Sequence, residues 1–299
     1  MTRFLLIGKD GQVGSNLEEI FKRNGTEYFA PSIDELDFSK PSKVKDYLSK
    51  LEFNPDYIIN AAAYTAVDKA EDEPEICDNI NHKSVKEIAE YCSSNDVRLV
   101  HFSTDYIYNG EGQSEFFEDE RSSLGPLNQY GKTKLAGDQA IELSGCEYLI
   151  FRTSWVYNHI GKNFVLTMLK LFQEKEEIQV IDDQTGSPTY AVDIAEATIE
   201  AINKAKDFSD FPSGVYHLTS PEKVTWFEFA NKILKTAKEK QLLKAIKLEN
   251  IKPVETSQFP TKAKRPHNSR LSVKKISDKF AIVLPDVETS IKDCFDRIG

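Results

Sequence analysis

Along the first half of the chain, short runs of apolar residues alternate with longer stretches whose apolar positions recur every three or four residues. A short apolar run that ends in glycine or small residues is typical of a buried strand, and the longer repeat is typical of an amphipathic helix. We therefore expect strands at residues 3–7, 27–30, 56–63, 98–104 and 147–154. Helices are expected at residues 13–22, 42–51, 79–95 and 128–144.

This alternation of strand and helix predicts an α/β fold of the Rossmann type, with a doubly wound parallel sheet and helices on both faces. Ligands of such sheets bind at the carboxyl ends of the strands. Beyond residue 155 the alternation weakens. The pattern there predicts helices at 163–172, 192–205 and 225–239, a short strand at 214–219 and a long ordered loop at 253–271.

Composition and charge narrow the class of protein. The chain of 299 residues has an ordinary hydrophobic share of 40%, and its net charge of −10 argues against a dedicated nucleic-acid surface, which would be basic. The N-terminal apolar run is too short for a signal sequence or a membrane span. Four dispersed cysteines form no CxxC pair. We expect a cytoplasmic protein with reduced thiols and no nucleic-acid or membrane partner.

A glycine-rich turn follows the first expected strand. Gly8, Gly11 and Gly14 give a GxxGxxG spacing, which differs from the stricter GxGxxG of many dinucleotide-binding proteins. Glycine lets the backbone approach a phosphate, and the helix N-terminus that follows offers N–H donors, so the turn predicts a nucleotide site. The end of the second strand, residues 29–32, carries neither an acid nor an arginine, which leaves both NADH and NADPH open.

The position of this turn suggests how the chain is divided. We expect a dinucleotide-binding Rossmann domain over residues 1–155, with segments at about 185–215 packing back on it. Residues 156–299 are expected to form mainly a smaller, mixed lobe that binds the substrate.

Tyr130 and Lys134 lie four residues apart at the start of an expected helix, so their side chains share one helical face. Most such pairs are only surface neighbours. A lysine ammonium beside a phenol, however, lowers its pKa from about 10 and makes the phenol usable for proton transfer near neutral pH. Two strand ends favour this interpretation. Residues 103–105, Ser-Thr-Asp, supply a hydroxyl, and residues 61–63, all alanine, leave room for a flat cofactor.

Motifs distributed over residues 7–271 carry a resemblance to a known family. They read GKDGQVG, NAAAYTAVDKAEDEP, FSTDYIYNG, YGKTKLAG, FRTSWVY, DQTGSPT, GVYHL and KRPHNSRL. Together they resemble the extended short-chain dehydrogenase/reductase family, and within it the reductases of dTDP-linked 4-keto sugars. The resemblance implies NADPH- or NADH-dependent reduction of the 4-keto group of dTDP-4-dehydro-L-rhamnose to dTDP-L-rhamnose.

The same resemblance implies a role for particular residues. Tyr130 would be the proton donor, Lys134 would tune it and hold the nicotinamide ribose, and Thr104 would bond the keto oxygen. The implied cofactor-binding residues are Gly8, Gly11, Gln12, Val13, Asp37, Phe38, Ala61, Ala62, Ala63, Tyr64 and Thr65, with Tyr130 and Lys134. The implied substrate-binding residues are Val67, Thr104, Asp105, Trp155, Asn163 and Arg265. Arg270 is either a further contact to the diphosphate or the partner of an acid.

Some relatives bind magnesium through three glutamates at a dimer interface. The matching positions of this chain hold Asn16, Val192 and Arg297, and these side chains cannot replace three carboxylates around a hard divalent ion. We therefore expect no metal there, and a monomer or weak dimer.

Two other functions stay open, those of an epimerase and of a non-catalytic subunit. A third, that of a 4,6-dehydratase, is disfavoured, because Tyr106 rather than a second carboxylate follows Thr104 and Asp105. An NDP-sugar epimerase of the same superfamily would use the same Tyr–Lys pair but recycle its cofactor. A non-catalytic, cofactor-binding regulatory subunit resembling the beta subunit of methionine adenosyltransferase would not need Thr104, Tyr130 and Lys134 together.

Overall fold

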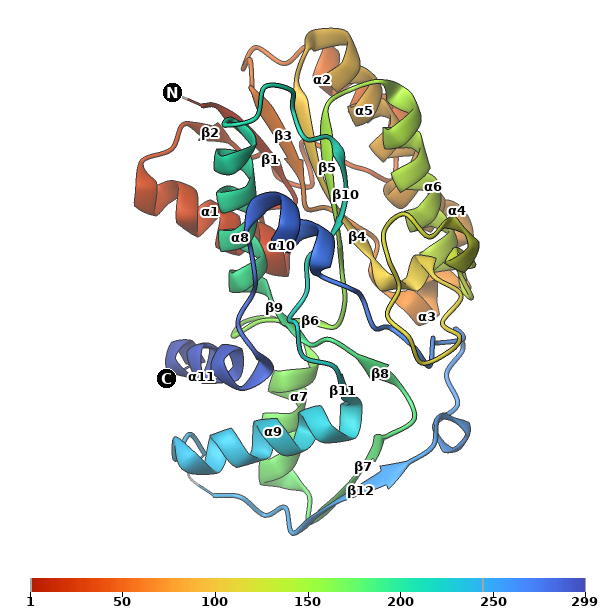
Figure 1. Cartoon of the computed structure of the whole chain (residues 1–299), viewed down its shortest axis with the longest axis vertical. Coiled ribbons are helices and arrows are strands. Elements are labelled where there is room, and N and C mark those ends of the chain that lie inside the picture. The colour runs from red at the N-terminus through yellow and green to blue at the C-terminus, as the bar shows by residue number, and fades with distance from the viewer. Residues whose placement is uncertain (1, 244, 299) are drawn as a thin grey trace.

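The computed structural model describes residues 2–243 and 245–298, and its central feature is a six-stranded parallel sheet (Figure 1). The spatial order of the strands is β10-β5-β4-β3-β1-β2. Their bounds are β1 (Phe4–Ile7), β2 (Tyr28–Phe29), β3 (Tyr57–Asn60), β4 (Arg98–Thr104), β5 (Tyr148–Thr153) and β10 (Gly214–His217). From β1 the chain runs to β2 on one side and then continues with β3 on the other. The switch point of the sheet therefore lies between β1 and β3, and the predicted Rossmann-type α/β class is confirmed.

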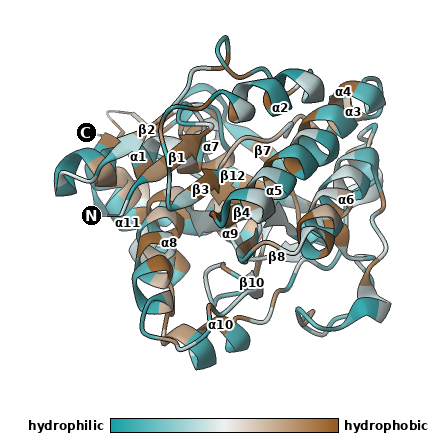
Figure 2. Cartoon of the chain, turned by 90° about the horizontal axis from the view of Figure 1, so that it is seen from above, coloured by the Kyte–Doolittle hydropathy of each residue, from teal (hydrophilic) through white to brown (hydrophobic). Residues whose placement is uncertain are grey.

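Helices cover both faces of this sheet. Successive strand residues point to opposite faces. Phe4 and Leu6 therefore belong to one apolar core, and Leu5 and Ile7 to another. The first core includes α1 (Gln12–Asn24), α8 (Ala191–Ala205) and α10 (Lys274–Phe280), and the second includes α2 (Pro41–Ser49), α5 (Ser84–Asn95) and α6 (Gln129–Ser144). Figure 2 shows the hydrophobic central strands between helices whose outer sides are hydrophilic. Burial on both faces explains why the strands read as unbroken apolar runs.

A separate apolar core lies beyond the carboxyl ends of the strands (Figure 1). It contains residues of α7 (Phe164–Glu174), β7 (Glu177–Ile181), α9 (Trp226–Glu239), β12 (Asn250–Val254) and α11 (Val287–Ile298). Strands β7 and β12 pair in parallel. Short ladders join β6 (Val156–Tyr157) to β9 (Thr189–Tyr190) and β8 (Thr185–Gly186) to β11 (Val224–Thr225). The division into two domains stays a prediction, since α8, β10 and α10 return from this half of the chain to the sheet.

The remaining helices are short. They are α3 (Val67–Ala70), α4 (Pro74–Asp78), the π-helix η1 (Asn79–Lys83) and the 3₁₀ turns η2 (Asp105–Ile107), η3 (Arg121–Ser123) and η4 (Thr256–Gln258). None of the helices formed by the described residues has the length and apolar character needed to cross a membrane.

The helix expected at residues 79–95 differs from the prediction, because its first turn is the π-helix η1 and only Ser84–Asn95 is α-helical. Asn81 in η1 accepts a hydrogen bond from Tyr64 N at 2.8 Å and donates to Tyr64 O at 3.1 Å. A side-chain amide that binds both backbone groups of Tyr64 holds the loop after β3 in place. Single π turns in helices are frequent at functional sites.

Candidate active site

The glycine turn brings β1, α1 and the loop after β3 into close contact. Gly8 has φ +84°, and a Cβ there would lie 2.5 Å from Ala62 N. A Cβ on Gly14 would lie 2.0 Å from Gly8 O. Gly11 is the N-cap of α1 and provides no side chain to cap the helix, so the first N–H groups of α1 face the turn without a side-chain acceptor. This arrangement fits a phosphate group at the helix N-terminus.

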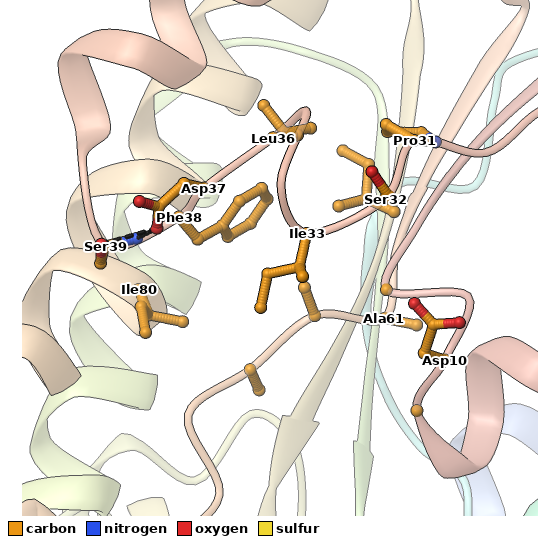
Figure 3. A pocket seen from close by; sticks show the side chains of 15 residues that line it. Asp10, Pro31, Ser32, Ile33, Leu36, Asp37, Phe38, Ser39, Ala61 and Ile80 are labelled. Carbon is orange, nitrogen blue, oxygen red and sulfur yellow. Dashed lines mark hydrogen bonds between the residues drawn. The ribbon is translucent and has the colours of Figure 1, made fainter.

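A cavity of about 260 Å³ opens beside this turn, at the switch point of the sheet (Figure 3). The predicted cofactor residues Gly8, Gly11, Asp37, Phe38, Ala61, Ala62 and Ala63 line it. Asp37 turns its carboxylate to Ser39 and Lys40, and these bonds lower its pKa to about 2. The carboxylate is therefore charged at neutral pH and already fully engaged. Apolar walls and small residues next to a phosphate-type turn fit the adenosine half of a dinucleotide.

The edge of this cavity near β2 holds both a cation and an acid. Lys9 Nζ donates to Ala30 O at 3.1 Å. Ser32 donates through its N and its Oγ to Glu35, at 2.7 and 2.8 Å. Because a cation would favour a ribose 2′-phosphate and an acid a free 2′-hydroxyl, this edge leaves both NADPH and NADH admissible.

Tyr130 and Thr104 come together beyond the carboxyl end of β4. Asn128 caps α6 by accepting from Gly131 N at 2.8 Å, which places Tyr130 in the first turn. Its ring packs edge-on against Tyr106, with centroids 5.7 Å apart. Burial raises the pKa of Tyr130 well above its ordinary value, and a hydrogen bond with Thr104 acts in the opposite direction. At neutral pH the phenol therefore holds its proton, as a proton donor must.

Lys134 is buried, and its side-chain nitrogen bonds to strand β4. Only 1% of it is exposed, and its Nζ lies 2.6 Å from Phe102 O and 3.0 Å from His101 Nε2. After burial, the groups that act most strongly on the pKa of Tyr130 are Thr104, Asp105, the Cys77 thiol and Asp138. The lysine is thus turned toward strand β4, and its role in tuning Tyr130 and holding the nicotinamide ribose stays a prediction.

Asp105 is buried next to Thr104, from which it accepts a hydrogen bond at 3.1 Å, and its second oxygen has no partner among the described residues. Burial raises the pKa of this carboxyl from 3.8 to about 6. An acid whose pKa is higher in the folded than in the unfolded state binds more protons when folded. Stability contributed by this group is therefore lost as pH rises from about 4 to 6.

We expect Asp105→Asn to be more stable than the parent protein at about pH 8, by up to about 3 kcal/mol, and to lose most of that advantage at about pH 4. The amide avoids the desolvated charge yet still accepts from Thr104. Urea unfolding of both proteins at the two pH values measures the difference. Asp210→Asn, at an exposed carboxylate, is the matched control. An advantage that did not depend on pH would contradict the assignment to this charge.

Trp155 stacks on a second indole that the sequence analysis did not select. The ring centroids of Trp155 and Trp226 lie 3.6 Å apart, and the angle between the ring planes is 9°. Trp155 has φ +48°, a left-handed conformation that is uncommon for a bulky residue. A Cβ on Gly186 would lie 2.6 Å from the Trp155 indole, so this glycine is required for the indole to fit. In the sequence Trp226 belongs to an expected amphipathic helix, and the local pattern does not distinguish it from an ordinary core residue.

The other predicted substrate residues make contacts of their own. Arg265 forms a bidentate pair with Asp68, at 2.8 and 3.1 Å, which brings it beside Val67 at the start of α3. Asn163 caps α7 through Leu166 N and donates to Asn158 O, so its amide is already occupied. Arg270 pairs with the amide of Asn268 rather than with an acid. These roles in substrate binding stay predictions.

Three residues stand where some relatives have magnesium-binding glutamates, and each of them makes contacts within this chain. Asn16 donates to Gln12 O, Val192 belongs to the core beyond the strand ends, and Arg297 pairs with Glu19 at 3.4 Å. Within residues 2–243 and 245–298, no group of three or more His, Cys, Asp or Glu side chains could hold a metal ion.

A phosphate-type turn at the switch point of a parallel sheet, with a phenol and a hydroxyl beyond the neighbouring strand, defines a class of protein. It is the class of nicotinamide-dependent short-chain dehydrogenases and reductases. The described residues fit that cofactor, since the turn excludes side chains where the backbone must approach a phosphate.

Comparison with known proteins gives the particular family. The profile described as RmlD substrate binding domain matches residues 2–299. A dTDP-4-dehydrorhamnose reductase of Escherichia coli strain K12 is 41% identical, over 98% of this chain and 97% of that protein. The crystal structure of a dTDP-4-dehydrorhamnose reductase from Bacillus anthracis strain Ames in complex with NADP is 32% identical, over 99% of this chain and 100% of that one, with a TM-score of 0.89. The chain belongs to this family, and the predicted resemblance is confirmed.

A more distant likeness concerns the fold alone. A UDP-glucose 4-epimerase of Thermus thermophilus, in complex with NAD, shares 19% identity at a TM-score of 0.75 over 99% of both chains.

Proposed function

We propose that this protein reduces the 4-keto group of dTDP-4-dehydro-L-rhamnose to give dTDP-L-rhamnose, with NADPH or NADH. The observation that carries the proposal is that Thr104, at the carboxyl end of β4, lies close enough to Tyr130 to lower the pKa of its phenol against the effect of burial. A reductase of a ketone needs a proton donor and a hydrogen-bond donor at one oxygen, and a neighbouring phenol and hydroxyl can supply both.

The side chains have distinct roles in this reaction. When bound, the reduced nicotinamide supplies hydride to C4 of the sugar. Tyr130 gives its proton to the C4 oxygen, and Thr104 donates a hydrogen bond to the same oxygen. For this Thr104 must turn its hydroxyl away from Asp105, to which it now donates at 3.1 Å. Lys134 holds the ribose and stabilises the phenolate that Tyr130 becomes.

The sugar nucleotide is proposed to bind against the core beyond the strand ends, in the mixed lobe of residues 156–299. The stacked pair of Trp155 and Trp226 offers a flat apolar surface of the kind on which nucleobases and sugars pack. Arg265 lies beside Tyr106, which packs on Tyr130, and is proposed to meet the diphosphate by exchanging its partner Asp68 for phosphate oxygens.

The chain has only two tryptophans, and both lie in this stack. We therefore expect that dTDP changes the intrinsic tryptophan fluorescence of the protein in a saturable manner. Trp226→Phe should keep a saturable change with a lower affinity, because stacking on an aromatic pair contributes about 0.5–1.5 kcal/mol, roughly two- to twelve-fold. Titration with ribose 5-phosphate, which lacks a base, is the control. An unchanged spectrum at saturating dTDP would place the nucleotide elsewhere.

Stoichiometry tests the proposed reaction against its two alternatives. The purified protein is incubated with dTDP-4-dehydro-L-rhamnose and NADPH or NADH. We expect one reduced nicotinamide to be consumed for each product formed. An epimerase would form product without net loss of the reduced cofactor, and a non-catalytic regulatory subunit would bind the cofactor without forming product.

We further propose a monomer or weak dimer that needs no magnesium, since Arg297 already pairs with Glu19. Light scattering with magnesium and with a chelator should then give the same mass.

We propose a cytoplasmic location, in keeping with four free, buried thiols.

A further inference from the structure

Behind the Tyr–Lys pair lies a buried chain of three polar side chains that the proposed reaction does not yet use. Asn60 ends β3, His101 lies in the middle of β4, and Lys134 lies in α6. All three are at most 1% exposed. Asn60 Nδ2 lies 3.1 Å from His101 Nδ1, and His101 Nε2 lies 3.0 Å from Lys134 Nζ. Polar side chains are rare at such depth unless their hydrogen bonds are specified.

The donors and acceptors of this chain admit one assignment of protons. Ala62 N donates to Asn60 Oδ1 at 3.1 Å, so the amide nitrogen of Asn60 is the atom that faces the imidazole. An amide nitrogen donates and cannot accept, and therefore His101 Nδ1 carries no proton. The ring proton of a neutral histidine then lies on Nε2 and points at Lys134.

This proton requires an acceptor, and the described group that faces it, at 3.0 Å, is the lysine nitrogen. An ammonium has no lone pair, whereas a neutral amine has one. Were Lys134 an ammonium donating to Nε2, His101 would be left without any ring proton, as an imidazolate. The hydrogen bonds are therefore satisfied when Lys134 is a neutral amine that accepts from His101 and donates to Phe102 O at 2.6 Å.

The surroundings of the lysine are consistent with this state. Burial lowers the pKa of Lys134 to about 8, against the opposing effects of Asp138 and of the Cys77 thiol. Asp138 is one turn further along α6 and is itself paired with Arg152, at 3.1 Å. Burial holds the pKa of His101 well below its ordinary value, so its imidazole is neutral. Among the described residues, no carboxylate bonds directly to Lys134 to keep it charged.

We propose that His101 is a positioning residue that stabilises the neutral amine form of Lys134 in the free protein, and that Lys134 held in this form takes up one proton from solvent when it leaves His101 to hold the nicotinamide ribose. The inference rests on the proposed function of Lys134. It adds that, above about pH 8, the cation which stabilises the phenolate of Tyr130 is formed when the cofactor binds. In the free protein burial keeps the proton on Tyr130.

Cofactor binding is expected to take up a proton, and only in a particular range of pH. The lysine has a pKa of about 8 in the free protein and a higher one once it is released from His101. Binding should therefore take up close to one proton at about pH 9 and much less at about pH 7. By linkage, affinity for the cofactor should fall up to tenfold for each unit of pH above about 8.

Titration calorimetry of the whole protein with NADH, in two buffers of different ionisation enthalpy, measures this uptake directly. NADH is used because it lacks the 2′-phosphate of NADPH, which titrates itself. Binding with no proton uptake at either pH would overturn the inference and leave the proposed function intact. Failure to bind NADH or NADPH at all would overturn the proposed function.

Variants identify the groups responsible. His101→Gln places an amide oxygen where it accepts from an ammonium, so Lys134 stays charged in the free protein and the uptake at about pH 9 should disappear while binding remains. Lys134→Met should also abolish the uptake. The matched control is His217→Gln, at a second fully buried histidine, which bonds to Tyr108 and Ser272 instead of Lys134.

Uptake by the control should equal that of the parent protein. Uptake that persisted in His101→Gln, or that vanished equally in His217→Gln, would overturn the role of His101. Should His101→Gln not fold, the calorimetry of the parent protein and of Lys134→Met still decides between uptake and its absence.

Discussion

Replacing Tyr130 by Phe is expected to lower turnover by on the order of 10²–10⁴-fold, the range for loss of a general acid, while the cofactor still binds. The substitution removes only the phenolic oxygen. The ring keeps its edge-on contact with Tyr106, and the backbone of α6 keeps its cap at Asn128. Because the buried phenol holds its proton at neutral pH, the substitution removes the proposed proton donor itself.

The measurement is the initial rate of loss of reduced nicotinamide at saturating substrate, with cofactor affinity determined separately by nicotinamide fluorescence. Tyr91→Phe, which removes a partly buried phenol on α5 remote from the site, is the matched control and should behave as the parent. Turnover within threefold of the parent in Tyr130→Phe would remove the tyrosine from the proposed mechanism.

Gly14→Ala is expected to destabilise the fold and abolish cofactor binding. The added Cβ would lie 2.0 Å from Gly8 O and 2.7 Å from Gly8 C, and both are backbone atoms that cannot turn away as a side chain would. Overpacking of a core typically costs 1–3 kcal/mol, and a clash with backbone belongs at or above the upper end, about 3 kcal/mol or more. For a chain of this size we expect the melting temperature to fall by about 6 °C or more.

Gly11→Ala provides the comparison within the same turn. Its φ of −79° suits any residue, and an added Cβ would lie 3.3 Å from Gly8 O. This variant should melt within about 2 °C of the parent yet bind the cofactor more weakly, because the methyl group lies where the backbone approaches a phosphate. Thermal melts followed by titration with NADPH separate the two effects. Equal stability of Gly14→Ala and the parent would show that the turn tolerates a side chain.

Local patterns were sufficient for the positions of most elements. The apolar run at residues 98–104 and the strand β4 coincide, and the expected helix at 128–144 is α6 to within one residue. Such segments were readable because burial on both faces makes a strand uniformly apolar and because a helix repeats its apolar face. The π turn at Asn79–Lys83 was not readable, since it results from the contact of Asn81 with the loop after β3.

His101 shows where local reasoning stopped. A histidine in the middle of an apolar strand was visible in the sequence, but its meaning depended on Asn60 and Lys134, which are 41 and 33 residues away. Trp226 was likewise visible but became notable only through its stack with Trp155.

The order of residues alone thus established the parallel α/β sheet, the phosphate-type turn and the presence of a phenol, a hydroxyl and an amine near neighbouring strand ends. These depend on short-range periodicity and on the steric freedom of glycine, which are properties of a few adjacent residues. Tertiary structure decided which way Lys134 points and which groups share its protons. Those properties depend on burial and on partners from separate strands, and only the folded chain brings such partners within hydrogen-bonding distance.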